Sequence, residues 1–199
     1  QGEAKKNISF DGRVVVGIEV CSNDTNLTLI SKANDKSILE SFHGGNLLLN
    51  GEDTPLMSHS FEKEDIIFVK FVKDLLLLCL TSEANLFLLT TTAKTKLENR
   101  DVTAAAVFNP KSNALSDGVL GKVDGSLSFF SIDPDANNLK IVKNSSKPKK
   151  FDIAEDDVEI YFLKAHFVKP LGPDNILVLH QSKVIFDGDE EDFEYKYQF

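Results

Sequence analysis

Residues 119–133, which read VLGKVDGSLSFFSID, decide the fold of this chain. An apolar run, Val119–Val123, is followed by Asp124-Gly125, and apolar side chains then recur at alternate positions. An Asp-Gly pair between two such runs is typical of a tight hairpin, because glycine supplies the backbone angles of the turn and the alternation gives one apolar face. The stretch therefore predicts an antiparallel β-hairpin.

The same shape recurs along the chain. An apolar run, a polar turn and a second apolar run also occupy Leu76–Leu89, Val14–Ile30 and Ile176–Asp187. Aligned on their second strands, the four hairpins are spaced by 59, 41 and 57 residues. The shortest spacing matches a propeller repeat of about 40–45 residues. The two longer spacings contain polar segments, near 44–58 and 144–157, that we interpret as insertions.

A further apolar strand with a Phe near its end precedes three of the hairpins, within residues 67–74, 104–111 and 162–170. Short strands separated by turn residues along the whole chain predict an antiparallel all-β fold. No stretch of a dozen residues shows helical periodicity, and the best helix candidate, Lys94–Arg100, is short.

One unit resembles a known repeat. Ala106-Val107-Phe108-Asn109-Pro110 followed by Val119–Asp133 resembles a WD40 repeat, in which a strand ending in Phe-Ser-Pro precedes an apolar hairpin with an Asp-Gly turn. The chain has no Trp and no Gly-His dipeptide, although Asp133 and Asp187 lie near the place of the family's Asp. The resemblance implies about four degenerate WD40-like β-propeller blades in one domain or propeller segment over residues 1–199.

Four blades are at the lower end of the range of about 4–8 that propellers use. An unclosed ring would expose apolar faces on its first and last blades, and such patches rarely stay uncovered. We therefore expect a larger or partner-completed propeller, with Val14–Val20 and Phe193–Phe199 covered. Eight residues are predicted to lie in the core: Phe71, Leu77, Leu88, Val107, Leu120, Phe129, Leu177 and Ile185.

The C-terminal segment is the strongest candidate for a partner contact. An acidic run at 187–192 is followed by aromatic residues that alternate with polar ones. In an extended strand these aromatic side chains all point one way. The segment is either the outer strand of the last blade or a strand that contacts a partner. The predicted partner-contact residues are Phe193, Tyr195, Tyr197 and Phe199.

The composition of the chain limits the classes of partner that we expect. The net charge is −9, with 22 basic and 31 acidic residues, which disfavours nucleic acid as the primary partner. No apolar run approaches the ~20 residues that span a bilayer, so membrane insertion is not expected. Cys21 and Cys79 lie in apolar runs and are predicted to be buried, reduced thiols. With few cysteines and no signal-like N-terminus, we expect an intracellular protein, nuclear or cytoplasmic.

Catalytic patterns are missing from the sequence. The four His residues lack zinc-site spacing, and there is no Gly-x-Ser-x-Gly, P-loop or dinucleotide fingerprint. We expect no enzyme activity, no metal and no cofactor, and a small-molecule ligand is not favoured.

Three hypotheses for function follow. The leading one is a non-catalytic protein–protein interaction scaffold, a propeller subunit of a larger intracellular complex that binds other protein subunits, by analogy with ribosome-assembly or coat scaffolds. The second is a secreted or lumenal β-sandwich that binds a glycan or receptor, which the sequons at Asn7, Asn23, Asn26 and Asn144 favour. The third is a hydrolase on a propeller, which needs acids or His residues gathered near one channel.

Overall fold

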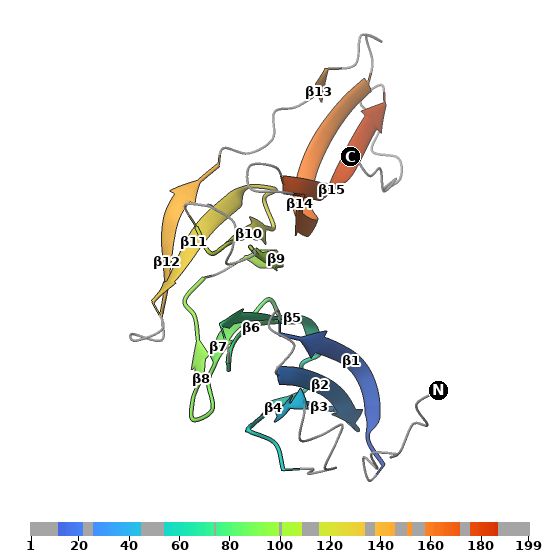
Figure 1. Cartoon of the computed structure of the whole chain (residues 1–199). Coiled ribbons are helices and arrows are strands. Elements are labelled where there is room, and N and C mark those ends of the chain that lie inside the picture. Colours follow the sequence, from blue (N-terminus) through green and yellow to red (C-terminus); the bar gives the residue numbers. More distant parts are fainter. Residues whose placement is uncertain are drawn as a thin grey trace, which may run out of the picture. The chain divides into compact units, whose positions relative to one another are not determined.

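The computed structural model describes residues 12–21, 26–44, 54–73, 75–99, 101–108, 116–133, 138–145, 151–152, 158–171 and 176–186. These parts of the chain form antiparallel β-sheets, which confirms the prediction of an all-β fold. The chain divides into two compact units, Gln1–Leu97 and Glu98–Phe199 (Figure 1). The prediction that residues 1–199 form a single propeller-like domain stays a prediction.

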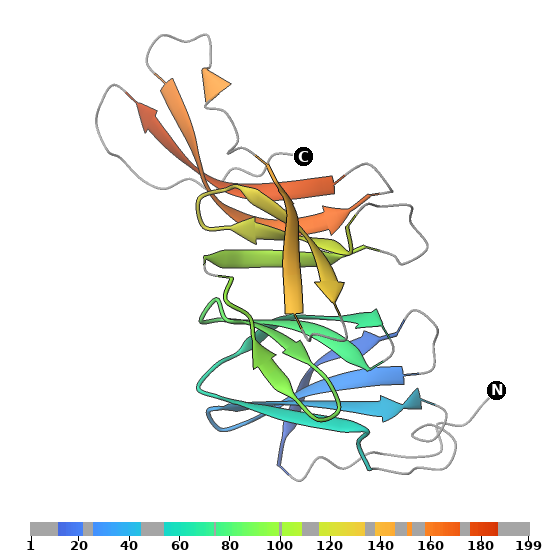
Figure 2. The same ribbon diagram turned by 90° about the vertical axis from the view of Figure 1, so that its left-hand side faces the viewer.

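The first unit holds two four-stranded sheets, each a simple meander in which strands adjacent in sequence are adjacent in space. Figure 2 shows the first sheet in blue to cyan. Its strands are β1 (Val14–Val20), β2 (Asn26–Ala33), β3 (Lys36–His43) and β4 (Met57–Glu62). The second sheet consists of β5 (Ile66–Lys73), β6 (Leu76–Thr81), β7 (Leu86–Leu89) and β8 (Lys94–Lys96).

The second unit also holds two sheets. One is a four-stranded meander of β9 (Val102–Val107), β10 (Gly118–Lys122), β11 (Leu127–Asp133) and β12 (Asn138–Asn144). The other pairs β13 (Phe151–Asp152), β14 (Val158–Pro170) and β15 (Ile176–Phe186).

The predicted hairpin at 119–133 is present as β10 and β11. Gly125 has φ 80°, a left-handed backbone that glycine adopts without steric cost, and its N–H donates to the Lys122 carbonyl at 3.0 Å. Asp124 accepts hydrogen bonds from the Ser126 N–H (2.9 Å) and hydroxyl (2.6 Å), which closes the turn from the side chain. Local turn chemistry therefore fixes the register of Val119 opposite Phe129.

The core of the first unit lies between its two sheets. Buried residues of β2, β3 and β4 meet residues of β5, β6 and β7, and the Phe61 and Phe87 rings pack edge to face with centroids 5.3 Å apart. The larger members of this cluster are Ile30, Leu39, Met57, Phe61, Val69, Phe71, Leu77, Phe87 and Leu89.

The core of the second unit lies between β9–β11 and the β14–β15 pair, and its contact strands are unusually close. A Cβ atom added to Gly121 would lie 2.6 Å from the Ala165 Cβ and 3.1 Å from Val168 Cγ2. Thr103, on β9, donates to the Ala165 carbonyl of β14 at 2.5 Å. The cluster contains Ala104, Ala106, Val119 and Val168, with half-buried Phe108, Leu127, Phe129, Ile176 and Val178 packed against it.

Four of the eight predicted core residues are confirmed as buried. Phe71, Leu77, Leu88 and Leu120 are buried. Val107, Phe129 and Leu177 are half-buried. The side chain of Ile185 lies outside the described residues.

The predicted hairpin within Ile176–Asp187 is wrong, because residues 176–186 form the single strand β15. Its residues pair with β14 along almost its whole length, with His180 opposite Ala165 and Ser182 opposite Phe162. Residues 180–183 contain no Gly or Asn to favour a left-handed turn, and the long β14 offers a continuous ladder, so the extended backbone keeps its hydrogen bonds.

The helix candidate Lys94–Arg100 is also wrong at its start. Lys94–Lys96 form β8, which pairs with β7. The predicted insertions lie largely outside the described residues, but each overlaps a strand that the sequence did not predict. Met57, in the first insertion, begins β4 and is buried, and Phe151–Asp152, in the second, form β13.

Of the two adjacent phenylalanines on β11, Phe130 should matter more for stability. It is fully buried and its ring covers Gly118, where an added Cβ would lie 2.4 Å from Phe130 Cζ, whereas Phe129 is half-buried. Phe130→Ala should cost about 3–5 kcal/mol of unfolding free energy, and Phe129→Ala clearly less. Urea unfolding of the two variants measures this, and an equal or reversed order would contradict the assigned register.

Candidate interaction surface

The four C-terminal aromatic residues predicted to contact a partner, Phe193, Tyr195, Tyr197 and Phe199, lie outside the described residues. That prediction therefore stays a prediction. The other surface expected to be covered, the strand Val14–Val20, is described in full as β1.

Strand β1 exposes its apolar side chains. Among the described strands it lies at the edge of its sheet, and it pairs with β2. The register shifts between Val15 and Gly17, so Val16 lies at a β-bulge. Exposed fractions are 65% for Val14, 51% for Val16, 65% for Ile18 and 52% for Val20, and Val15 is also exposed. We call these five residues the β1 surface.

Charges next to the β1 surface are compensated within the unit. Arg13 forms an ion pair with Glu40 at 2.8 Å. Glu19, the one charged residue of β1, pairs at 2.6 Å with Lys70 of β5. Because these charges already have partners in the chain, the β1 surface is apolar and locally close to neutral.

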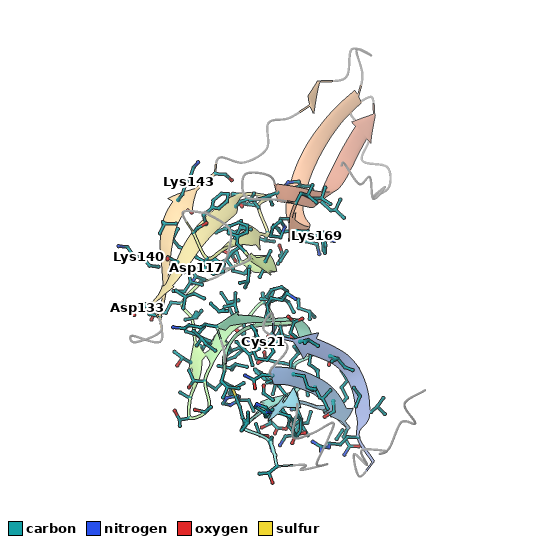
Figure 3. All side chains as sticks on the ribbon, in the orientation of Figure 1. Cys21, Asp117, Asp133, Lys140, Lys143 and Lys169 are labelled. Carbon is teal, nitrogen blue, oxygen red and sulfur yellow. The ribbon has the colours of Figure 1, made fainter. Side chains whose placement is uncertain are left out.

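Two other edge strands carry charged side chains. The edge strand β8 reads Lys94-Thr95-Lys96, and the edge strand β12 carries Lys140 and Lys143, which extend from it in Figure 3. Charged side chains on an edge oppose pairing with another strand, because pairing would bury them. Strand β1 carries one charged residue, Glu19, and it is paired with Lys70.

Lys94 has a further contact that the sequence did not indicate. Its Nζ lies 4.6 Å from the centroid of Phe61 and 5.7 Å from that of Phe87, and it donates to the Ser60 carbonyl at 2.7 Å. It therefore joins the outer strands of the two sheets of its unit.

Reactive groups do not assemble into a site in the part of the chain that the structure describes. No three His, Cys, Asp or Glu side chains there are placed to hold a metal ion. His59 makes a 2.7 Å hydrogen bond with the Thr90 carbonyl, a contact that ties β4 to the end of β7. Partial burial lowers the pKa of His180. No helix among the same residues is long and apolar enough to cross a membrane.

Cys21 and Cys79 are both free and buried, as predicted (Cys21 is labelled in Figure 3). Burial raises the pKa of the Cys79 thiol from 9.0 to about 12; Glu64 also raises it, whereas Lys94 lowers it. The thiolate is the reactive form, so this thiol is inert at neutral pH.

Comparison with known proteins gives a limited result. No family model and no curated protein matches the chain. Among solved structures, it is similar to the computationally designed Ika8 protein, with a TM-score of 0.49 and 13% identity over 87% of this chain and 46% of that one. It is similar to Sqt1 of Saccharomyces cerevisiae, with a TM-score of 0.49 and 10% identity over 92% and 48%. The chain spans about half the length of each.

The buried thiol gives a prediction. In a Cys21→Ala variant, Cys79 should react with an aromatic disulfide reagent at pH 8 only as fast as the structure opens, and at once in denaturant. Because the folded pKa is raised, the folded state holds its proton longer than the unfolded state, so stability should fall as pH rises from about 9 to about 12. Rapid labelling of the folded protein would contradict this burial.

Proposed function

We propose that this chain is a non-catalytic interaction scaffold, built from WD40-like β-propeller blades and working as a subunit of a larger intracellular complex, nuclear or cytoplasmic. The observation that carries the proposal is the β1 surface, an exposed apolar strand on an otherwise packed sheet. Apolar patches rimmed by polar groups mark contact sites for other proteins. Its partners are other protein subunits.

The repeated sheets support the propeller part of the proposal. Three of the four described sheets are four-stranded antiparallel meanders, which is the make-up of a propeller blade. In each unit, one sheet packs its apolar face on the next. The WD40-like hairpin at 119–133, with its Asp-Gly turn, adds the sequence resemblance.

Two further features support an intracellular protein partner. Both cysteines are free and buried, which suits a reducing compartment. The net charge of −9 opposes binding to the phosphates of nucleic acid.

The test is to express the tagged chain in cells, cross-link through lysines and map the cross-linked partners by mass spectrometry. Cross-links from Lys32, which pairs with Val14, and from Lys70, which pairs with Glu19, should dominate. A Val20→Asp variant should lose most recovered partners, because a carboxylate in an apolar contact loses its hydration.

The matched control is Val142→Asp on β12, at a side chain exposed to a similar degree (46%). It should recover the same partners as the wild type. Equal partner recovery by the Val20→Asp variant and the wild type would show that the β1 surface does not carry the function.

A further inference from the structure

We infer that the connection between β4 and β5, residues 63–65, opens and closes together with the end of β6 and the turn that follows it, residues 81–85, and that the Glu64 carboxylate holds both segments closed. We call these two segments the Glu64 latch. The inference goes beyond the proposed function, because it concerns a part of the first unit that moves as one piece. It rests on the hydrogen bonds of Glu64, on two backbone conformations and on a matching turn in the second unit.

The Glu64 carboxylate bridges the two segments. Its Oε2 accepts hydrogen bonds from the Thr81 hydroxyl and from the Asn85 side-chain amide, the latter at 3.1 Å. Thr81 is fully buried and Glu64 is half-buried. Hydrogen bonds to an ionised acceptor are stronger than those between neutral groups. One side chain of the connection therefore binds both ends of the segment 81–85.

The neighbours of Glu64 extend the latch to the first sheet. The Asp65 N–H donates to Ser82 Oγ at 3.1 Å, and the Ser82 N–H donates to the Asp65 carbonyl at 2.8 Å. On the other side, the Lys63 N–H donates to the carbonyl of Asp35, in the turn between β2 and β3, at 2.7 Å. Lys32 forms a 2.6 Å ion pair with Asp65. The latch therefore joins a turn of the first sheet to a turn of the second.

Two residues of the latch have a left-handed backbone without being glycine. The φ angle is 58° for Lys63 and 57° for Ala84. A side chain other than hydrogen makes this conformation costly, because its Cβ crowds the following carbonyl, and it persists where surrounding contacts hold it. Lys63 directly precedes Glu64, and Ala84 directly precedes Asn85, one of the partners of Glu64. Loss of the Glu64 hydrogen bonds therefore leaves both residues free to relax.

The turn at residues 122–126 of the second unit has the same backbone pattern as the segment 81–85. In each, the N–H of the first residue donates to the carbonyl of the last, and the N–H of the fourth donates to the carbonyl of the first, all at 3.0 Å. The fourth residue is left-handed in both, Ala84 in one and Gly125 in the other. The two turns are thus matched in backbone geometry and differ in side chains.

The side chains that close the matched turns come from different places. In the second unit, Asp124 accepts from the N–H and the hydroxyl of Ser126, so the closing carboxylate belongs to the turn itself. Gly125 adopts its conformation there without steric cost. In the first unit, the closing carboxylate is Glu64 of another segment, and the left-handed residue is Ala84. The closed form of the segment 81–85 therefore depends on the connection.

The experiment measures native-state hydrogen exchange of backbone amides in the full 199-residue chain. Three amides report on the latch, those of Lys63, Ser82 and Ala84, because each donates one of its hydrogen bonds. Segments that open as one unit exchange with one opening free energy. The protection factors of the three amides should therefore agree within about threefold in the wild type.

Ala84→Gly tests the coupling between the segments. Glycine removes the cost of the left-handed backbone, so the closed latch becomes more stable. Exchange should slow by about threefold at Ser82 and, although it lies in the other segment, at Lys63 as well.

Glu64→Ala tests the carboxylate. The variant removes both side-chain hydrogen bonds, so all three amides should exchange about tenfold faster or more. Glu64→Gln keeps an acceptor oxygen without the charge and should give a smaller increase. The matched control is Glu62→Ala, which removes an exposed carboxylate that is paired with Lys36 and should leave the three amides unchanged. The amides of Val123 and Gly125, in the second unit, should not change in any variant.

A change at Ser82 that leaves Lys63 unaffected, in either Ala84→Gly or Glu64→Ala, would show that the segments open separately and overturns the inference. So does exchange in Glu64→Ala that matches the wild type, or a Glu62→Ala variant with the same effect as Glu64→Ala. Should Glu64→Ala fail to fold, Ala84→Gly, which stabilises the closed form, decides the coupling by itself.

Discussion

Face-to-face packing of neighbouring sheets is the constraint on which each half of this chain depends. All six residues of β6, Leu76–Thr81, are buried, so neither face of this strand is exposed to water. A strand buried on both faces reads as an unbroken apolar run rather than as an alternating one. The sequence Leu76-Leu77-Leu78-Cys79-Leu80 is therefore explained by the position of β6 inside its sheet, with Leu77 and Cys79 in the core shared with the first sheet.

The same constraint explains the close approach in the second unit. Small residues, Gly121, Ala104 and Ala165, bring β10, β9 and β14 together, and the Thr103 hydroxyl then reaches a carbonyl of the opposite sheet. Larger side chains at these positions would separate the sheets and break that hydrogen bond. The larger side chains packed against this cluster are those of half-buried Leu127, Phe129, Ile176 and Val178.

Elements with local determinants could be predicted from the sequence. The hairpin at 119–133 follows from Asp124-Gly125, and β1 was predicted with its observed bounds. Elements fixed by distant partners could not. The course of β15 depends on pairing with β14, and the strand β8, Lys94-Thr95-Lys96, has no apolar pattern of its own. Period-2 reasoning also cannot tell which of Phe129 and Phe130 is fully buried, because the deciding contact is with Gly118. The exposure of β1 likewise depends on what packs against it, and the C-terminal aromatic prediction lies outside the described residues.

The contacts of Lys94 affect how the two sheets of the first unit respond to salt. Its ammonium group contacts Phe61 of β4 and Phe87 of β7 and donates a hydrogen bond to the Ser60 carbonyl. One solvent-exposed side chain therefore connects the edge strands of two sheets. Among the described residues, Lys94 contacts aromatic faces and a carbonyl oxygen rather than a carboxylate, so added salt screens this contact less than it screens two opposite charges. The contact that Lys94 makes between β8 and β4 is therefore less sensitive to salt. The Glu19–Lys70 ion pair next to β1, in contrast, weakens as ionic strength rises.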